Sequence, residues 1–449
     1  MMTTRLKPLM AALLVFFSMQ ASAASFESEQ FTLKNGLHVV VLPNHKVPAV
    51  TQLICYHAGA MDDPYGKSGL AHYLEHLMFK GTARFPKGQF TAIIAKHGGN
   101  DNAFTSHDYT AFYQTIAVSQ LPLVMELEAD RMQHLVFDAE ETRKEKEVIL
   151  EERSERIDND PGALLSEQMQ AALYLNHQYH RPVIGWRHEM VGLTPEDANN
   201  FYQHYYAPNN ATLIVSGDIT AAQLKPLAEK YYGTIPPHLI PAHITTYEPP
   251  AIAARRVILR DNRVHVPQLV RYYMAPNSAE NLKQSAALTV LSYVLGEGDT
   301  SRLYHSLVED KGLATNIDSS YDGVARGPVI FSFAMALRPG QDINELEKGL
   351  DSVLQNFLKN GITEEELTRA KNRVRTDSIY SKESFKTLAF LFGHVIASGL
   401  NIGYVEHWED TINQVTIDDV NNAAKQLLVP EKSVTGQLLS APTPDKGNL

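Results

Sequence analysis

Residues 72–76 read His72-Tyr73-Leu74-Glu75-His76, and this stretch decides both the fold and the chemistry expected of the chain. Positions i, i+3 and i+4 of an α-helix project from one face. His72 and His76 can therefore bind one metal ion together, with Glu75 beside them as a general base. Catalytic zinc usually takes three protein ligands and leaves a fourth position to water, whose pKa it lowers. The order H-x-x-E-H is a metallopeptidase signature, although an ordinary amphipathic helix can carry the same five residues.

A second acidic segment, residues 138–160, is expected to form a long helix that supplies the third ligand. With about 100° of rotation per residue, Glu145, Val148, Ile149 and Glu152 fall on one inward face. An inward carboxylate without a partner is costly, so a cation is expected beside it. We predict that Glu152 is the third ligand and that Glu145 supports the ligands or relays a proton. The alternative is a solvated helix held by ion pairs along its surface.

The block Gly69–Thr82, G-L-A-H-Y-L-E-H-L-M-F-K-G-T, resembles the signature of the pitrilysin family of zinc peptidases. The branch that it resembles contains the mitochondrial processing peptidase and its bacterial relatives. The stretch Gly98–Thr105 is similar to the glycine-rich edge strand of that family. The resemblance implies a clamshell around a substrate chamber, and it implies one Zn²⁺ per chain held by His72, His76 and Glu152, with Glu145 as a further glutamate of the site.

The first residues are typical of a secretory signal peptide. Arg5 and Lys7 precede the apolar run 9–17, which is too short to span a bilayer, and Ala21-Ser22-Ala23 fits a cleavage site. Cys55 is the only cysteine, so no intrachain disulfide is expected. An exported protein without disulfides favours the periplasm. The net charge of −11 becomes −13 without the signal, which argues against nucleic-acid and anionic-membrane partners, and no membrane anchor is expected.

The chain carries an internal duplication. The segment Thr194–Asn200 and the segment Thr416–Asn422 share Thr, Asp and a pair of Asn at one offset, and each is followed by a proline. This pattern predicts an α+β protein of two similar mixed α/β units in a clamshell-like arrangement. The proline-rich stretch between them predicts the joint. We expect a signal peptide at residues 1–23, a catalytic zinc-binding domain at 24–235, a linker at 236–252 and a degenerate domain without metal at 253–449.

The second half departs from the family pattern. The segment that corresponds to the metal helix, Ala286–Gly296, has no histidine or acid and is expected to be core. Active relatives carry an arginine and a tyrosine in the second half that bind the substrate backbone and the oxyanion. Val308 and Thr315 stand in their places, and losing one oxyanion donor typically costs about a hundred- to a thousandfold in rate. We expect a related chain without the zinc motif to supply this pair in a heterodimer, although a homodimer, or Arg302 with Tyr304, is an alternative.

The substrate is expected to be an unstructured peptide. The stretch 102–113 reads as an edge strand to which an extended peptide can add, with Asn102 and Ala103 giving backbone contacts. An edge strand protected by His107 and Asp108 is the other interpretation. The leading hypothesis is a periplasmic zinc endopeptidase or oligopeptidase. The alternatives are a zinc-binding module without turnover and a scaffold subunit of a heteromeric complex.

Overall fold

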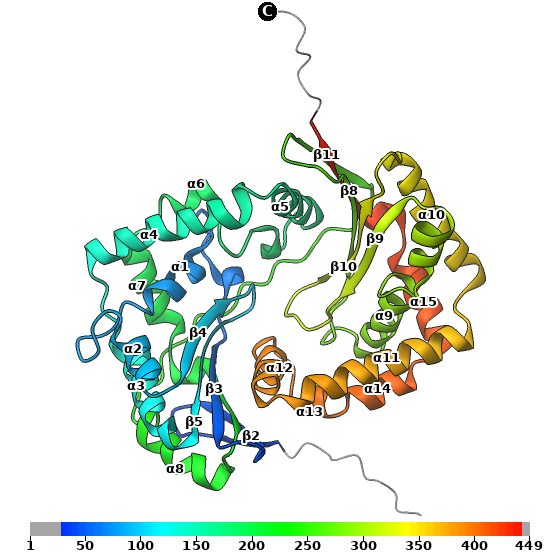
Figure 1. Ribbon diagram of the computed structural model, residues 1–449. Coiled ribbons are helices and arrows are strands. Elements are labelled where there is room, and N and C mark those ends of the chain that lie inside the picture. Colours follow the sequence, from blue (N-terminus) through cyan, green and yellow to red (C-terminus); the bar gives the residue numbers. More distant parts are fainter. Residues whose placement is uncertain (1–27, 442–449) are drawn as a thin grey trace, which may run out of the picture.

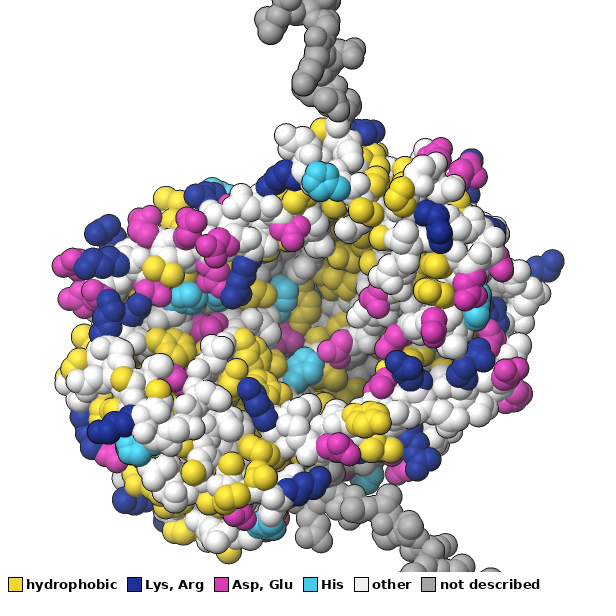
Figure 2. Space-filling view, in the orientation of Figure 1, with side chains coloured by type: hydrophobic (Ala, Val, Ile, Leu, Met, Phe, Trp, Pro, Cys, Tyr) yellow, Lys and Arg dark blue, Asp and Glu magenta, His cyan; other side chains and the backbone are white. Residues whose placement is uncertain are grey.

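A computed structural model describes residues 28–441 of the chain, which form two units that face each other (Figure 1) and enclose a hollow in the space-filling view (Figure 2). The predicted signal peptide lies outside these residues. The space-filling view shows hydrophobic side chains on the far wall of the hollow (Figure 2). The predicted clamshell of two mixed α/β units is therefore confirmed. No helix within residues 28–441 combines the length and the apolar character needed to cross a bilayer.

The first unit has a six-stranded sheet in the order β1-β2-β6-β3-β5-β4. Its core lies between the sheet and a helical layer, and β3 is buried along nearly its whole length. The strands are β1 (Glu29–Thr32), β2 (His38–Pro43), β3 (Ala49–Tyr56), β4 (Asn100–Thr105), β5 (Thr110–Ala117) and β6 (Ala211–Gly217), and the helices are α1 (Leu70–Leu77), α2 (Gln89–Lys96), α3 (Leu121–His134), α4 (Ala139–Arg153), α5 (Pro161–Leu173), α6 (Arg187–Met190), α7 (Pro195–Tyr205) and α8 (Ala221–Tyr231).

The second unit repeats this topology with a five-stranded sheet in the order β7-β11-β8-β10-β9. It lacks a counterpart of β1. The strands are β7 (Arg255–Asp261), β8 (Gln268–Ala275), β9 (Ala314–Tyr321), β10 (Val329–Leu337) and β11 (Ser433–Ser440), and the helices are α9 (Leu282–Leu295), α10 (Ile343–Asn360), α11 (Glu364–Glu383), α12 (Phe385–Ala397), α13 (Gly403–Glu406), α14 (Trp408–Gln414) and α15 (Ile417–Leu427).

The recurring sequence segments begin equivalent helices. Thr194 and Asp197 form a capping box at the start of α7, and Thr416 and Asp419 form the same box at the start of α15. In both boxes the aspartate N–H lies 3.2 Å from the threonine hydroxyl that accepts its hydrogen bond. Such boxes satisfy N–H groups that a helix start leaves free, which explains the residues that both copies share.

One helix of each unit packs on the sheet of the other unit. Helix α5 of the first unit packs on β7, β8 and β11, and α12 of the second unit packs on β2, β3 and β6 (Figure 1). In the first contact Met169 lies against Gly436, where even a Cβ atom would approach its sulfur to 2.1 Å. In the second, a Cβ atom at Gly393 would approach the Leu53 side chain to 2.5 Å. The two units are thus joined by two helix-to-sheet interfaces.

The segment between the two sheets is anchored to the first unit. The carboxylate of Glu248 accepts hydrogen bonds from the backbone N–H groups of Leu175 and Asn176, at 2.9 and 2.8 Å. His243 lies 2.6 Å from Asp62. These contacts fix the course of the chain between the sheets, while the domain boundaries given above remain predictions.

Candidate metal centre

Helix α1 carries the H-x-x-E-H residues and is fixed at its first turn. It begins after Gly69, whose φ of 86° favours glycine and whose backbone lies against Ile184. The buried carboxylate of Asp63 accepts hydrogen bonds from the N–H groups of Gly69 and Ala71 at 2.7 and 2.8 Å. The helix dipole also stabilises a negative charge at this end of the helix. Asp63 therefore sets where the metal helix starts.

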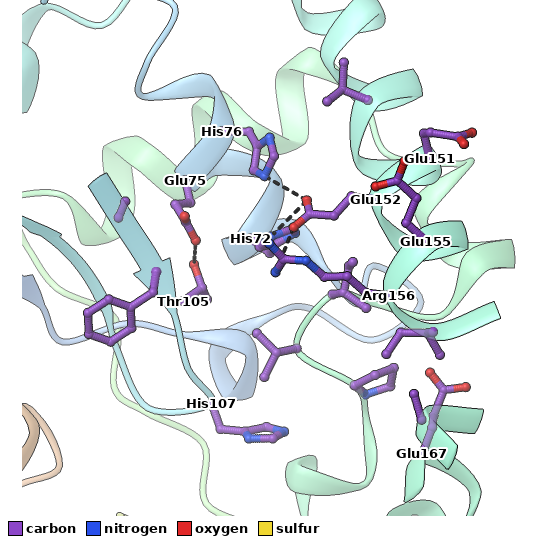
Figure 3. Close-up of a pocket in the computed structure, with 18 of the residues that line it drawn as sticks. His72, Glu75, His76, Thr105, His107, Glu151, Glu152, Glu155, Arg156 and Glu167 are labelled. Atoms are coloured by element: carbon purple, nitrogen blue, oxygen red, sulfur yellow. Dashed lines mark hydrogen bonds and ion pairs between the residues drawn. The ribbon is translucent and has the colours of Figure 1, made fainter. Parts of the chain in front are cut away.

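The three predicted ligands meet at one point. His72 and His76 lie on α1 and Glu152 on α4, and Figure 3 shows the three side chains converging. Their ligand atoms lie within 4.8 Å of one another, and no second such cluster of three occurs in residues 28–441. Glu152 Oε2 is 3.1 Å from His76 Nε2 and 3.7 Å from His72 Nε2.

These residues fit a zinc ion. Bonds of 2.0–2.2 Å at a tetrahedral metal separate its ligand atoms by roughly 3.4 Å, a value between the two measured distances. The Oε2 atom of Glu152 is buried without a hydrogen-bond partner, and a cation would satisfy it. Two imidazoles and one carboxylate are also a common ligand set of catalytic zinc.

Glu145 supports His76 from the side away from Glu152. Its Oε1 lies 2.9 Å from His76 Nδ1, and its other oxygen forms an ion pair with Lys80. Because a carboxylate only accepts hydrogen bonds, Nδ1 carries the proton and Nε2 is free for a metal. Glu145 is thus placed as a support of the ligand, in the position expected from the sequence.

Glu75 lies beside the ligand cluster and is buried with 8% of its surface exposed. Its carboxylate accepts a hydrogen bond of 2.6 Å from the hydroxyl of Thr105 on β4 (Figure 3). Burial raises the pKa of Glu75, and the Thr105 hydrogen bond opposes this rise. A carboxyl with a raised pKa is suited to accepting and returning a proton near neutral pH.

The surroundings give the two histidines different proton affinities. Burial and the neighbouring His76 lower the pKa of His72 to about 4. Burial also acts against the charged form of His76, but its contacts with the Glu145 and Glu152 carboxylates prevail and raise its pKa to about 9. The contact with His76 lowers the pKa of Glu152. In the absence of metal, His76 therefore holds a proton that zinc must displace.

The cluster opens onto a cavity of about 1120 Å³ in the first unit. Asn102 and Ala103 of β4 are among its lining residues. Strand β4 pairs with β5 and forms the end of its sheet, so its other side is a free edge. The expectation of one strand over 102–113 is wrong, because a turn separates β4 from β5. The hydroxyl of Ser106 accepts the N–H groups of Asp108 and Tyr109 and closes this turn.

His107 and Asp108, which were expected to protect this edge, make other contacts. Asp108 is buried and accepts hydrogen bonds from the Tyr179 hydroxyl and the Arg326 N–H, so it joins the two units. His107 lines the cavity, and its Nε2 lies 3.1 Å from the Arg181 carbonyl oxygen. Val148, expected on an inward face, is half exposed because that face of α4 borders the cavity.

The second unit has a polar contact between its helices α9 and α11. Helices α9 and α11 correspond to α1 and α4, and α9 is buried without a histidine, as expected. The hydroxyl of Tyr293 on α9 donates a hydrogen bond of 2.8 Å to Asp377 on α11.

The structure does not support Arg302 with Tyr304 as a substitute for the missing pair. Arg302 forms two hydrogen bonds of 2.6 Å with Glu366 within the second unit. Neither Arg302 nor Tyr304 lines the cavity of the metal cluster. Val308 packs against the second core, and the Thr315 hydroxyl lies 3.4 Å from the Ala336 carbonyl oxygen.

Several residues of the site were not singled out from the sequence. Thr105 and Lys80 lie within the two motif blocks, so proximity in the sequence was a signal for both. Arg153 and Arg156 follow the third ligand, Glu152, along the chain. In the sequence they look like the charged residues of a solvated helix. Arg153 is buried and contacts Glu167 at 2.8 Å. Only the tertiary structure shows that this arginine faces inward.

Known proteins that are similar to this chain include named zinc proteases. Residues 38–186 match the family model described as insulinase (peptidase family M16), and residues 192–374 match the one described as peptidase M16 inactive domain. Zinc protease PqqE of Helicobacter pylori is 31% identical over 96% of this chain and 97% of its own length. A crystal structure of a protease from Helicobacter pylori has a TM-score of 0.87 at 30% identity, covering 92% of this chain and 99% of that one. The periplasmic protease PqqL of Escherichia coli shares the fold, with a TM-score of 0.77 at 20% identity over 92% of this chain and 47% of that one.

Proposed function

The chain belongs to the M16 family of peptidases, and from this premise we propose that it is a periplasmic zinc-dependent endopeptidase or oligopeptidase of unstructured peptides. One observation carries the proposal. His72, His76 and Glu152 converge to within 4.8 Å on the wall of a cavity, and Glu75 lies beside them without being part of the ligand cluster. Two relatives that each match 88% or more of this chain are named zinc proteases.

Glu75 acts as the general base in this proposal. His72, His76 and Glu152 would hold a zinc ion, which would lower the pKa of a water molecule and polarise the scissile carbonyl. Glu75 lies where its carboxylate could accept a proton from water and return it to the leaving amine. Thr105 orients its carboxylate from the edge strand. Glu145, ion-paired with Lys80, keeps His76 in the tautomer whose Nε2 faces the metal.

The substrate is an extended peptide that adds to the free edge of β4. Backbone hydrogen bonds along this edge give affinity without demanding a sequence. Asn102 and Ala103 line the cavity on this strand, and the Asn102 side chain accepts the Ala103 N–H at 2.8 Å. A peptide that pairs here displaces this contact. Unfolded segments are preferred because an edge strand can pair only with a chain that is itself extended.

A related chain supplies the arginine and tyrosine that this chain lacks. Val308 and Thr315 cannot donate strong hydrogen bonds to an oxyanion, and Arg302 is engaged elsewhere. PqqL, of which this chain covers 47%, has about twice its length. A heterodimer of this chain with a paralogue would reach the same size from two polypeptides. The name of PqqL as a periplasmic protease and the buried, unpaired Cys55 support the same compartment for this chain.

A zinc-binding or scaffold subunit without turnover is the second candidate function, and the absence of the arginine and tyrosine favours it. Hydrolysis of a pool of unstructured peptides by the mature chain, alone and with its paralogue, separates the two. Chelator-sensitive cleavage that Glu75→Gln abolishes while zinc stays bound would support the peptidase. His76→Ala is the matched variant and should lose zinc as well. Bound zinc with no cleavage in either mixture would establish the second function.

A further inference from the structure

The two oxygens of the Glu152 carboxylate have different neighbours. Oε2 faces the two histidines, whereas Oε1 lies 2.9 Å from a terminal nitrogen of Arg156 (Figure 3). Arg156 is four residues further along and lines the same cavity. It is the one lysine or arginine among the described residues that line this cavity. Oε2 of Glu152 therefore faces the candidate metal site, and Oε1 is held by the Arg156 guanidinium.

Buried contacts of a neighbouring residue hold the backbone that carries Arg156 in place. Residues Ser154–Asp158 continue α4 as a turn of π-helix, a feature often found at functional sites. The buried Arg153 fixes this turn through Glu167 of α5 at 2.8 Å and the Gly185 carbonyl at 2.7 Å. Although the Arg156 side chain is 71% exposed, the position from which it reaches Glu152 is set by buried contacts.

The same arrangement occurs on the other side of His76. One oxygen of Glu145 accepts from His76 Nδ1, and the other forms an ion pair with Lys80. Each of the two carboxylates around His76 thus has one oxygen toward the imidazole and one toward a cation. A charge-assisted contact of this kind fixes orientation as well as adding energy.

We infer that Arg156 is a positioning residue that holds Glu152 so that Oε2 alone faces the metal and a coordination position stays open for water. This inference rests on the proposed zinc peptidase function. Groups that orient metal ligands typically contribute about 10- to 100-fold to metal affinity, and an exposed ion pair such as this one contributes less, about fivefold at most. The guanidinium also repels a divalent cation, but this repulsion is weak around an exposed side chain in a high dielectric. Orientation therefore outweighs repulsion.

The test measures zinc affinity of the full mature chain by competition with a chromogenic chelator. Arg156→Gln should bind zinc about two- to fivefold more weakly than the wild type, and Arg156→Lys should lie between them. Lys144→Gln is the matched control, because Lys144 forms an i, i+4 pair of 2.7 Å with Glu140 on the same helix. This control should keep wild-type zinc affinity. The thermal midpoint of the metal-free Arg156→Gln chain should also stay unchanged, which a merely structural role would not allow.

Unchanged or tighter zinc binding in Arg156→Gln would overturn the inference, the latter by showing that repulsion prevails. Peptidase activity that stays low at saturating zinc would also overturn it, in favour of direct contact with substrate. Failure of the wild type to bind zinc at all would refute the proposed function instead, so the two failures are distinguishable.

Discussion

Loss of the buried arginine behind the third ligand should destabilise the first unit strongly. Arg153 and Glu167 are only 5% and 6% exposed, and two guanidinium nitrogens reach the carboxylate at 2.8 and 3.1 Å. Arg153→Ala leaves the Glu167 charge buried without a partner, which costs about 3–5 kcal/mol. The Gly185 carbonyl loses its donor as well. For a unit of this size the thermal midpoint should fall by about 6–20 °C.

The assay is thermal unfolding of wild type and variants at one scan rate. Arg187→Ala is the control, since Arg187 reaches Asp158 of the same turn at 3.1 Å but is 53% exposed. An exposed pair contributes about 0–1 kcal/mol. The double variant Arg153→Met with Glu167→Leu removes both charges and should recover most of the loss. If Arg153→Ala shifted the midpoint no more than Arg187→Ala does, the reasoning from burial would be refuted.

Three further predictions concern the metal helix and the contact between units. Because His76 has a raised pKa of about 9 and His72 a lowered one of about 4, protons compete with zinc at His76. Zinc affinity should rise about tenfold per pH unit between pH 6 and 8, with release of about one proton in calorimetry in buffers of different ionisation enthalpy. A flat profile would contradict this. Asp63→Ala removes the acceptor for two N–H groups at the start of α1. A loss of about 1–2 kcal/mol in denaturant unfolding, with weaker zinc binding, is the expected outcome. Asp108→Ala removes the partner of the Arg326 N–H and should weaken the contact between units by about 2–3 kcal/mol. Unchanged X-ray scattering and proteolysis rates would argue against that role.

The ligands could be predicted because helical geometry fixes them locally. His72 and His76 share a helix face whatever the rest of the chain does. The phase of the later helix separated Glu152 from its exposed neighbours for the same reason. The repeated capping residues predicted the duplication, since the boxes at α7 and α15 satisfy the same N–H groups. Local periodicity was therefore sufficient for these features.

Other features depend on contacts that periodicity does not encode. A helix with an apolar face must be covered, but the pattern does not say by which sheet, and α5 and α12 pack on the sheet of the other unit. The turn at Ser106 was missed because its side-chain hydrogen bonds replace the glycine that commonly marks such turns. The buried role of Arg153 was missed because an inward arginine becomes evident only once Glu167 faces it.

The packing of α5 and α12 on the sheet of the other unit also limits the order in which the two units can fold. Residues of the first sheet such as Val40, Leu53 and Ile214 are covered by Leu388 and Phe392 of α12. A growing chain therefore carries the metal ligands long before it can bury that face of their sheet. A nascent or truncated chain ending before residue 385 keeps this apolar surface open. The metal-binding unit therefore cannot bury this face of its sheet until α12 of the second unit has been made.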